Sequence, residues 1–153
     1  YSSLNNNILY TVKEISSAEA QAVRHPVLRE GKPLESAIFP DDDLKDTFHV
    51  GVIYKGKPVG TVTLIKKNNE NFSAENQYQL RGMAVLQAQQ KKGLGALMVK
   101  KAEALLLERG GAFIWLNARE VAVLFYEKMG YETYGDSFVV PGIGLHYLMK
   151  KSF

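Results

Sequence analysis

The alternation of apolar and polar residues predicts a run of β-strands in the first half of the chain. Residues 7–13 alternate well enough to form a first strand. Residues 47–54 and 58–65 are rich in β-branched side chains, and a short turn containing Gly56 separates them. Because a short glycine-containing connection between two such runs is typical of a β-hairpin, we expect these two strands to pair with each other.

A helix is expected between the first strand and the hairpin. Ser16 and Glu19 stand three residues apart at the start of an alanine-rich stretch, which is the signature of a capping box. The helix should run from there towards Arg24, because Pro26 lacks an N–H group and breaks or kinks a helix. Residues 30–46 hold glycine, proline and several acidic residues, and they predict a loop or short helical turns.

The second half of the chain begins with a strand that leads into a helix. Residues 77–86 predict the strand, in which Gly82 indicates a bulge or the close approach of a ligand. From Leu94 onwards apolar residues recur at helical spacing, and Gly110-Gly111 supplies a stop signal. We expect the buried face of this helix to consist of Leu94, Leu97, Met98, Ala102 and Leu105.

Shorter elements complete the chain. Residues 112–116 predict an apolar strand, residues 121–129 a second helix, and residues 131–135 and 145–150 two closing strands. The apolar face of the second helix is expected at Val121, Leu124, Phe125 and Met129. The alternation of strands and helices predicts an α/β (α+β) fold with a mixed sheet and helices on both faces. With no repeat or linker in sight, residues 1–153 are expected to form a single domain.

Composition narrows the class of protein further. A chain of 153 residues with 46% hydrophobic and 23% charged residues is typical of a soluble globular domain. The absence of cysteine excludes disulfides, thiolate metal sites and a cysteine nucleophile, and it favours a cytoplasmic setting. Only His25, His49 and His146 are available as imidazole ligands, so we expect no metal site. No apolar run is long enough for a membrane helix, so no membrane partner is expected.

The distribution of charge is more informative than the net charge of +3. Residues 87–101 carry four lysines and no acidic residue, whereas residues 35–46 carry five acidic residues and one lysine. The basic segment contains no aromatic residue, so we expect no nucleic-acid partner. The acidic segment is expected to be a solvated loop, with at most a minor part in guiding a cationic amine.

The turn between the strand at residues 77–86 and the helix at Leu94 is suited to binding phosphate. Gly93 and Gly95 allow the backbone to come close to a ligand, and the free N–H groups at a helix start attract anions. Lys91 and Lys92 add positive charge. Because the lysines precede the glycines and Met98 stands where a third glycine would be needed, neither a Walker loop nor a dinucleotide-binding fingerprint fits. The alternative for this segment alone is an ordinary helix start.

Two motifs resemble those of the GCN5-related N-acetyltransferases, the GNAT family. Gln90-x-x-Gly93-x-Gly95 is similar to the coenzyme A motif of that family. Residues 115–119 followed by residues 125–131 are similar to its second signature, at the expected distance along the chain. Further matches point to a bacterial subgroup of mostly uncharacterised members. The resemblance implies a twisted, mostly antiparallel sheet of about six or seven strands.

The resemblance also implies a reaction and a binding mode. Acetyl-CoA would be the cosubstrate, and a primary amine would attack its thioester directly within a ternary complex. The pantetheine would pair with the backbone of the strand, and the pyrophosphate would lie on the amides of the following turn. The coenzyme-binding residues implied in this way are Met83, Ala84, Val85, Gln90, Lys91, Lys92, Gly93, Leu94, Gly95, Ala96, Asn117, Phe125 and Lys128.

Tyr126 matches the general acid of the family. A phenol is protonated at neutral pH and can supply the proton that a departing thiolate needs. Asn117 has two compatible interpretations, because with Glu120 it resembles a helix N-cap, and in the family it hydrogen-bonds the pantetheine. Phe125 and Lys128 would border the adenine.

The general base is left open, because the strand before the turn lacks the glutamate that many relatives carry there. His49, His146 and a chain of water molecules are the candidates, and a structural role is the simpler interpretation of both histidines. Arg81 would favour an acceptor with a carboxylate or phosphate if it faced the acceptor cleft; otherwise it is a surface strand residue.

The acceptor itself is not specified by the sequence. A small-molecule or peptide amine fits the resemblance, and the enzyme could act alone or as a homodimer. The alternative function is a non-catalytic or regulatory module of the same fold that binds coenzyme A.

Overall fold

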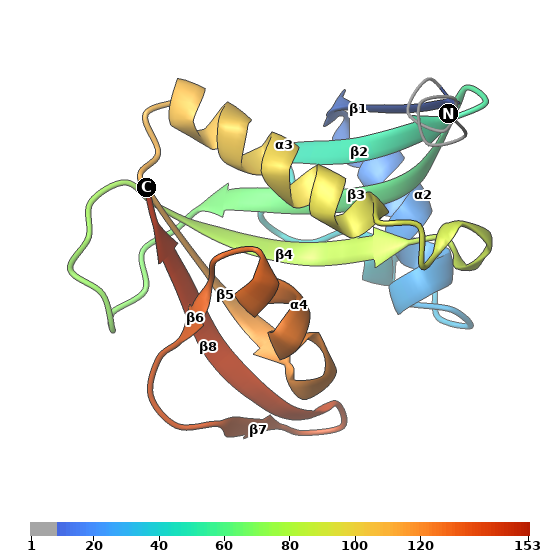
Figure 1. Cartoon of the computed structure of the whole chain (residues 1–153). Coiled ribbons are helices and arrows are strands. Elements are labelled where there is room, and N and C mark those ends of the chain that lie inside the picture. Colours follow the sequence, from blue (N-terminus) through green and yellow to red (C-terminus); the bar gives the residue numbers. More distant parts are fainter. Residues whose placement is uncertain (1–8) are drawn as a thin grey trace.

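The computed structural model describes residues 9–153, in which a single mixed sheet carries three α-helices (Figure 1). The strands are β1 (Tyr10–Ile15), β2 (Phe48–Tyr54), β3 (Lys57–Lys66), β4 (Gln77–Val85), β5 (Phe113–Arg119), β6 (Glu132–Thr133), β7 (Phe138–Val140) and β8 (Gly144–Ser152). The helices are α2 (Ser17–Leu28), α3 (Leu94–Glu108) and α4 (Val123–Lys128), and short 3₁₀ turns lie at Leu34–Ala37, Gln87–Gln89 and Glu120–Ala122. No helix of residues 9–153 is long and apolar enough to cross a bilayer.

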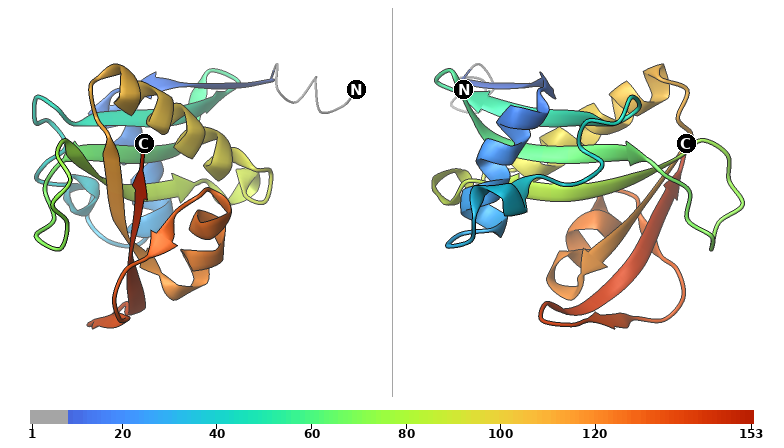
Figure 2. Two further views of the ribbon diagram at one scale, coloured as in Figure 1. Left: turned by 60° about the vertical axis from the view of Figure 1, so that its left-hand side comes forward. Right: turned by 180° about the vertical axis from the view of Figure 1, so that it is seen from behind.

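The sheet confirms the expected mixed, mostly antiparallel fold. Its strand order is β1-β2-β3-β4-β5-β8-β6. β7 also pairs with β8, at residues 144–146, whereas β6 pairs with residues 149 and 150. Within residues 9–153, only β4 and β5 run parallel to each other. α2 covers one face of the sheet, whereas α3 and α4 cover the other, so helices lie on both faces as predicted (Figure 2). The two short strands β6 and β7 bring the number of strands to eight.

The parallel contact between β4 and β5 is short. Only Gln77–Gln79 of β4 pair with Phe113–Trp115 of β5. Beyond Gln79 the two strands diverge, as the two ribbons in Figure 1 show. The sheet is therefore split along most of β4, and the backbone edge that faces β5 has no strand partner there among residues 9–153.

The β2–β3 hairpin forms where the sequence predicts it. Lys55 and Gly56 make a two-residue turn with φ values of 50° and 77°. Two consecutive positive φ values are typical of the type I′ turn, whose twist matches that of the paired strands. The first strand begins later than expected, at Tyr10, and residues 7 and 8 of the predicted strand lie outside the described residues.

Helix α2 begins as predicted but ends later. Ser16 accepts the Glu19 amide at 3.1 Å and its own amide donates to Glu19 at 2.9 Å, so the capping box is confirmed. The prediction that the helix stops near Arg24 is wrong, because it continues through Pro26 to Leu28. Pro26 lies in the last turn of α2, so the one hydrogen bond that it cannot donate is lost near the end of the helix.

Helix α3 packs on the sheet through a face slightly different from the expected one. Leu94, Met98 and Ala102 are buried as predicted. Leu97 is 40% exposed, however, and Leu106 takes the place expected for Leu105 in the fully buried set. The helix ends at Glu108, and the Gly111 amide donates to the Leu106 carbonyl at 2.9 Å, which confirms the glycine stop signal.

The apolar face predicted for the helix at residues 121–129 is wrong at two of its four positions. Val121 and Leu124 are 88% and 61% exposed, and α4 begins only at Val123 after a 3₁₀ turn. Phe125 and Met129 pack against the core as predicted, and Tyr126 is the buried residue of the helix. The change from 3₁₀ to α geometry alters the angular spacing of side chains, so a single 3.6-residue period misplaces residues at the start of the segment.

A bulge interrupts the pairing of β3 with β4. Thr61 is opposite Ala84 and Thr63 is opposite Arg81, so two residues of β4 face one residue of β3. Gly82 lies in this bulge with a φ of 67°, a conformation that a side chain disfavours. A Cβ atom there would also lie 3.1 Å from Arg24 and from Phe39. The bulge predicted from Gly82 is therefore confirmed.

Candidate active site

A cleft opens between β4 and β5 where the two strands stop pairing. Its volume is about 570 Å³, within the usual range for sites that bind small molecules. The lining comes from β4, β5, the turn before α4, the segment after α2 and the β7–β8 hairpin. Among the residues singled out in the sequence, Met83, Asn117, Tyr126, Arg81 and His146 line this cleft.

The turn that follows β4 is shaped for an anion. Lys91 and Gly93 have φ values of 63° and 77°, and Gly93 is the N-cap residue that precedes α3. The Gln90 side chain donates to the Val85 carbonyl at 2.9 Å, which closes the turn onto the end of β4. The amides of the first turn of α3 have no helical partner, and the positive end of the helix dipole lies there. These are the amides of Leu94, Gly95 and Ala96.

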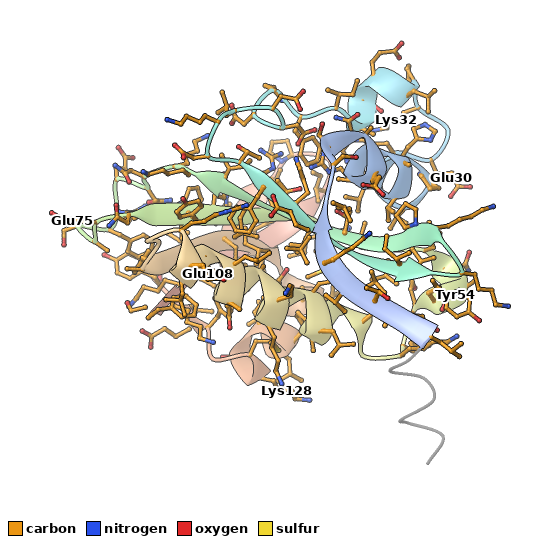
Figure 3. The ribbon with its side chains drawn as sticks, turned by 90° about the horizontal axis from the view of Figure 1, so that it is seen from above. Glu30, Lys32, Tyr54, Glu75, Glu108 and Lys128 are labelled. Atoms are coloured by element: carbon orange, nitrogen blue, oxygen red, sulfur yellow. The ribbon has the colours of Figure 1, made fainter. Side chains whose placement is uncertain are left out.

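Phe125 joins α4 to this turn. A Cβ atom on Gly95 would lie 3.4 Å from the Phe125 ring, so the glycine leaves room for the ring beside the start of α3. Lys91 and Lys92 are exposed in the turn, and Lys92 reaches Gln89 at 3.3 Å. Lys128 is exposed at the end of α4, away from the cleft lining (Figure 3).

The backbone of β4 beside the turn is accessible from the cleft on one side only. Ala84 is buried, and Met83 and Val85 are half-buried. The β3 strand pairs with one edge of this segment, at Thr61 and Gly60. The opposite edge faces the gap between β4 and β5, where an extended ligand could form hydrogen bonds with it.

Asn117 does not cap a helix. It lies within β5, opposite Leu148 of β8, and its side chain is exposed at the cleft. The prediction of an N-cap paired with Glu120 is therefore wrong, because the chain remains extended through Arg119 and then enters a 3₁₀ turn. This position leaves the amide of Asn117 free to bind a ligand.

Tyr126 lies at the cleft with its ring held on two sides. The ring of Phe125 is 5.0 Å away and that of Tyr131 is 5.8 Å away, both at steep angles to it. The Tyr131 hydroxyl donates to Glu103 at 2.8 Å, which fixes that neighbour. Burial raises the pKa of Tyr126 well above that of a free phenol, so its proton is retained at neutral pH. Within residues 9–153 the Tyr126 hydroxyl makes no hydrogen bond to the protein, and it is free to donate to a ligand.

His146 is the histidine that lines the cleft. It is only 7% exposed, and its Nδ1 lies 2.9 Å from the Gly144 carbonyl. Because a carbonyl can only accept, Nδ1 carries a proton, and in a neutral ring Nε2 is then the proton acceptor. A general base uses a nitrogen of this kind.

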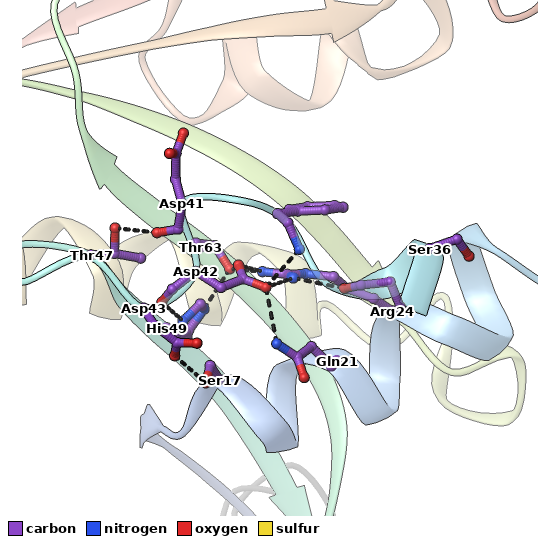
Figure 4. A network of polar contacts seen from close by, with 12 residues as sticks. Ser17, Gln21, Arg24, Ser36, Asp41, Asp42, Asp43, Thr47, His49 and Thr63 are labelled. Carbon is purple, nitrogen blue, oxygen red and sulfur yellow. Dashed lines mark hydrogen bonds and ion pairs between the residues drawn. The ribbon is translucent and has the colours of Figure 1, made fainter. Parts of the chain in front are cut away.

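His49 lies elsewhere, in a buried network between α2 and the strands β2 and β3 (Figure 4). Its two ring nitrogens are 2.7 Å from the Thr63 hydroxyl and 3.0 Å from the Asp42 carbonyl. Burial lowers the pKa of His49, so the ring is neutral at neutral pH. With both nitrogens occupied and no place in the cleft lining, His49 has the structural role that the sequence favoured.

The centre of that network is a buried ion pair that the sequence does not predict. Arg24 donates to the two carboxylate oxygens of Asp42 and, at 2.7 Å, to Thr63. Asp42 also accepts the Phe39 amide at 2.9 Å and the Gln21 side chain at 3.1 Å. The acidic segment 35–46 was expected to be solvated, yet Asp42 is only 3% exposed. The expectation is therefore wrong for this residue, which anchors the loop under α2.

Comparisons with known proteins identify the family. The Acetyltransferase (GNAT) family model matches residues 11–131. The uncharacterised N-acetyltransferase YitI of Bacillus subtilis is 33% identical over 141 residues, which cover 92% of this chain and 95% of YitI. The chain therefore belongs to the GNAT family of acetyltransferases, and it is an acetyl-CoA-dependent N-acetyltransferase. The resemblance drawn from the two sequence motifs is confirmed.

Solved structures share the fold. An aminoglycoside 6′-N-acetyltransferase complexed with coenzyme A has a TM-score of 0.72 and 17% identity, with 93% of this chain and 96% of that chain covered. An acyl-CoA N-acyltransferase from Pseudomonas aeruginosa has a TM-score of 0.74 and 16% identity, with 94% and 98% covered. The split sheet and its helices are therefore the architecture of this family.

Proposed function

We propose that the enzyme transfers the acetyl group of acetyl-CoA directly to a primary amine within a ternary complex, with Tyr126 as the general acid. The observation that carries this proposal is the protonated Tyr126 phenol at the cleft between β4 and β5. The amine nitrogen bonds to the acetyl carbon, and the bond from that carbon to sulfur breaks. The Tyr126 proton neutralises the departing thiolate, and a base takes the proton that the amine loses.

The residues around the cleft fit acetyl-CoA. The open edge of β4 at Met83, Ala84 and Val85 offers backbone groups to the pantetheine, and Asn117 faces it from β5. The amides that begin α3 offer a site for the pyrophosphate, with Gln90 closing the turn. Phe125 and Lys128 come from α4 and border the adenine in this proposal. We propose the 3₁₀ turn at Glu120–Ala122 and α4 as the wall that keeps the thioester away from bulk water.

A thiol-release assay tests this function. Because the chain contains no cysteine, a thiol-reactive dye detects only the coenzyme A that the reaction releases. The proposal predicts that dye reduction depends on both acetyl-CoA and an amine, and that mass spectrometry finds the amine heavier by one acetyl group. Coenzyme A binding without amine-dependent release across a broad amine panel would instead indicate a non-catalytic module.

Removal of the positive charge in the turn tests the proposed pyrophosphate site. We expect the double variant Lys91→Gln/Lys92→Gln to raise the Kd for acetyl-CoA by about 3- to 10-fold at low salt, because each exposed lysine contributes modestly to an anion site. Raising the salt concentration should shrink the difference, since it screens exposed charges. The control Lys66→Gln/Lys67→Gln removes the same charge at the far end of β3. An equal loss of affinity in both variants would contradict the assignment.

His146 is our proposed general base. The orientation of its ring leaves Nε2 free at the cleft, whereas both nitrogens of His49 are engaged. We expect His146→Asn to lower kcat by about 10-fold, since water can replace a base in part. His49→Gln, by comparison, should change stability but not kcat. An unaltered kcat in His146→Asn would transfer the role to a chain of water molecules.

A further inference from the structure

The charged side chains that line the cleft are all basic. Its lining contains three arginines, Arg29, Arg81 and Arg119, together with His146. No aspartate or glutamate belongs to that lining within the described part of the chain. A cationic wall repels polycationic amines and attracts molecules that carry an anionic group.

Arg81 is the best placed of the three. It lies on β4 immediately before the bulge at Gly82, and its side chain is half-buried. Its guanidinium carbon is 4.3 Å from the centre of the Phe39 ring, and that of Arg24 is 3.9 Å from the same centre. Phe39 thus contacts the Arg81 guanidinium, and this cation–π contact restricts the positions that its N–H donors can take.

The charge of Arg81 has no ion-pair partner in the described part of the chain, although the carboxylates of Asp41 and Asp42 lie close enough to act on it. Asp42 itself is engaged with Arg24, Gln21 and the Phe39 amide. None of the ion pairs found in residues 9–153 involves Arg81. Burial lowers the pKa of Arg81, and the Arg24 charge lowers it further, while Asp41 and Asp42 act in the opposite sense. Arginine nevertheless stays charged at neutral pH, so a half-buried cation without a partner lines the cleft.

A second polar group beside Arg81 is also without a partner. Gln79 lies two residues before it, on the same face of β4, and is 8% exposed at the cleft. Its buried Oε1 accepts no hydrogen bond within residues 9–153. A buried acceptor without a hydrogen-bond partner is costly to the fold alone, and the half-buried Arg81 beside it is a donor without an ion-pair partner. They are explained if a ligand satisfies both.

We infer that the acceptor is an amine that also carries an anionic group, a carboxylate or a phosphate, which Arg81 binds. Arg29 and Arg119 strengthen the field from the rim of the cleft, and the Gln79 carbonyl accepts a hydrogen bond from the same molecule. Arg81 is thus a specificity-determining residue, and the cleft selects amino-acid-like or phosphorylated amines against polyamines and aminoglycosides. This inference rests on the proposed function, because it concerns the acceptor of that reaction.

The alternative occupant of Arg81 is a phosphate of acetyl-CoA itself. Arg81 precedes Met83 on β4, whereas the turn from Gln90 to Ala96 follows the strand end. The two cationic sites therefore lie on opposite sides of the backbone edge proposed for the pantetheine. Direct binding measurements separate the two occupants, because only a coenzyme contact changes the Kd for acetyl-CoA in the absence of acceptor.

Matched acceptors provide the test. Thiol release is measured with the L-amino acids and their amides, with O-phosphoethanolamine and ethanolamine, and with spermidine and kanamycin. We expect the anionic member of at least one pair to be preferred in kcat/KM by 10-fold or more. Comparison of each amino acid with its amide tests recognition of a carboxylate. Comparison of O-phosphoethanolamine with ethanolamine tests recognition of a phosphate. Preference for the neutral or polycationic amines overturns the inference but leaves the proposed function standing, whereas no acetylation of any amine overturns both.

Variants assign the preference to Arg81. We expect Arg81→Gln to lower kcat/KM for the preferred anionic acceptor by about 10- to 100-fold, the usual weight of a hydrogen bond to a charged group. The kcat/KM for the neutral acceptor of the same pair should change by less than about 3-fold. Arg81→Lys should recover part of the loss, because lysine keeps the positive charge but lacks the forked N–H donors of a guanidinium. Arg109→Gln is the matched control, since Arg109 stacks on Phe48 and pairs with Glu14 outside the cleft. An equal loss on both members of the pair, or a raised Kd for acetyl-CoA in Arg81→Gln, overturns the assignment.

Discussion

Replacing Tyr126 with phenylalanine is expected to lower kcat by about 100-fold or more, the usual contribution of a positioned general acid. The substitution removes only the hydroxyl, which makes no hydrogen bond to residues 9–153, so the packing against Phe125 and Tyr131 is kept. The Kd for acetyl-CoA and the thermal stability should therefore stay close to those of the natural chain. Steady-state thiol release and calorimetric binding measure the two quantities separately.

The matched control for this prediction is Tyr134→Phe. Tyr134 is 43% exposed and lies outside the cleft lining, so loss of its hydroxyl should leave kcat unchanged. Because burial raises the pKa of Tyr126, its deprotonation should not limit turnover at any pH below the ordinary phenol value of about 10. Turnover of Tyr126→Phe that equals the natural rate would remove Tyr126 from the mechanism.

Breaking the buried Arg24–Asp42 pair is expected to have the largest effect on stability. Asp42→Asn leaves the Arg24 guanidinium buried at 0% exposure without its counter-charge. Loss of one partner of such a pair lowers the free energy of unfolding by about 3 to 5 kcal/mol, a large part of the total for a domain of this size. Urea denaturation measures the change. The exposed pair Lys150–Glu132 is the control, and Lys150→Gln should cost less than about 1 kcal/mol.

A double variant tests whether the two residues act as a unit. Arg24→Met/Asp42→Leu should lose less stability than the two single replacements added together, because no unpaired charge remains. The coupling would be contradicted if the stability losses of the two single variants added up to that of the double variant within about 0.5 kcal/mol.

The pair also gives stability a pH dependence. Burial alone would raise the pKa of Asp42, but hydrogen bonds from Arg24, Phe39 and Gln21 outweigh it and hold the pKa below the ordinary 3.8. The folded state therefore binds this proton less readily than the unfolded chain does. The contribution of Asp42 is complete above the unfolded value and is lost as the pH falls through the lower folded value, so Asp42→Asn should weaken this part of the acid transition.

Local patterns predict the elements whose structure is set by nearby residues. The β2–β3 hairpin, the Ser16 cap and the Gly82 bulge each depend on backbone preferences within a few positions, and all three are found as expected. The exposed Val121 and Leu124 show the limit of this approach. Their position depends on a switch between two helix types, which the apolar pattern does not record.

The site could be predicted only in part for a similar reason. The turn around Gly93 is a contiguous motif, so its residues stand out in the sequence. The proposed acceptor side of the cleft instead combines Arg29, Arg81 and His146 from three distant segments, and only the fold brings them together. Asp42 shows that a contiguous segment can also mislead. Nothing in the run of acidic residues distinguishes Asp42, which is buried, from its solvated neighbours.

The split between β4 and β5 has a consequence for solubility. Unpaired strand edges are the surfaces through which folded proteins template aggregation. Here the open edge lies within the sheet, in the gap where β4 and β5 diverge. It is not one of the outer edges of the sheet, which β1 and β6 form. A slender extended molecule can reach those backbone groups, whereas the broad edge of another sheet cannot. The chain thus keeps a strand edge permanently available without exposing it to its own copies.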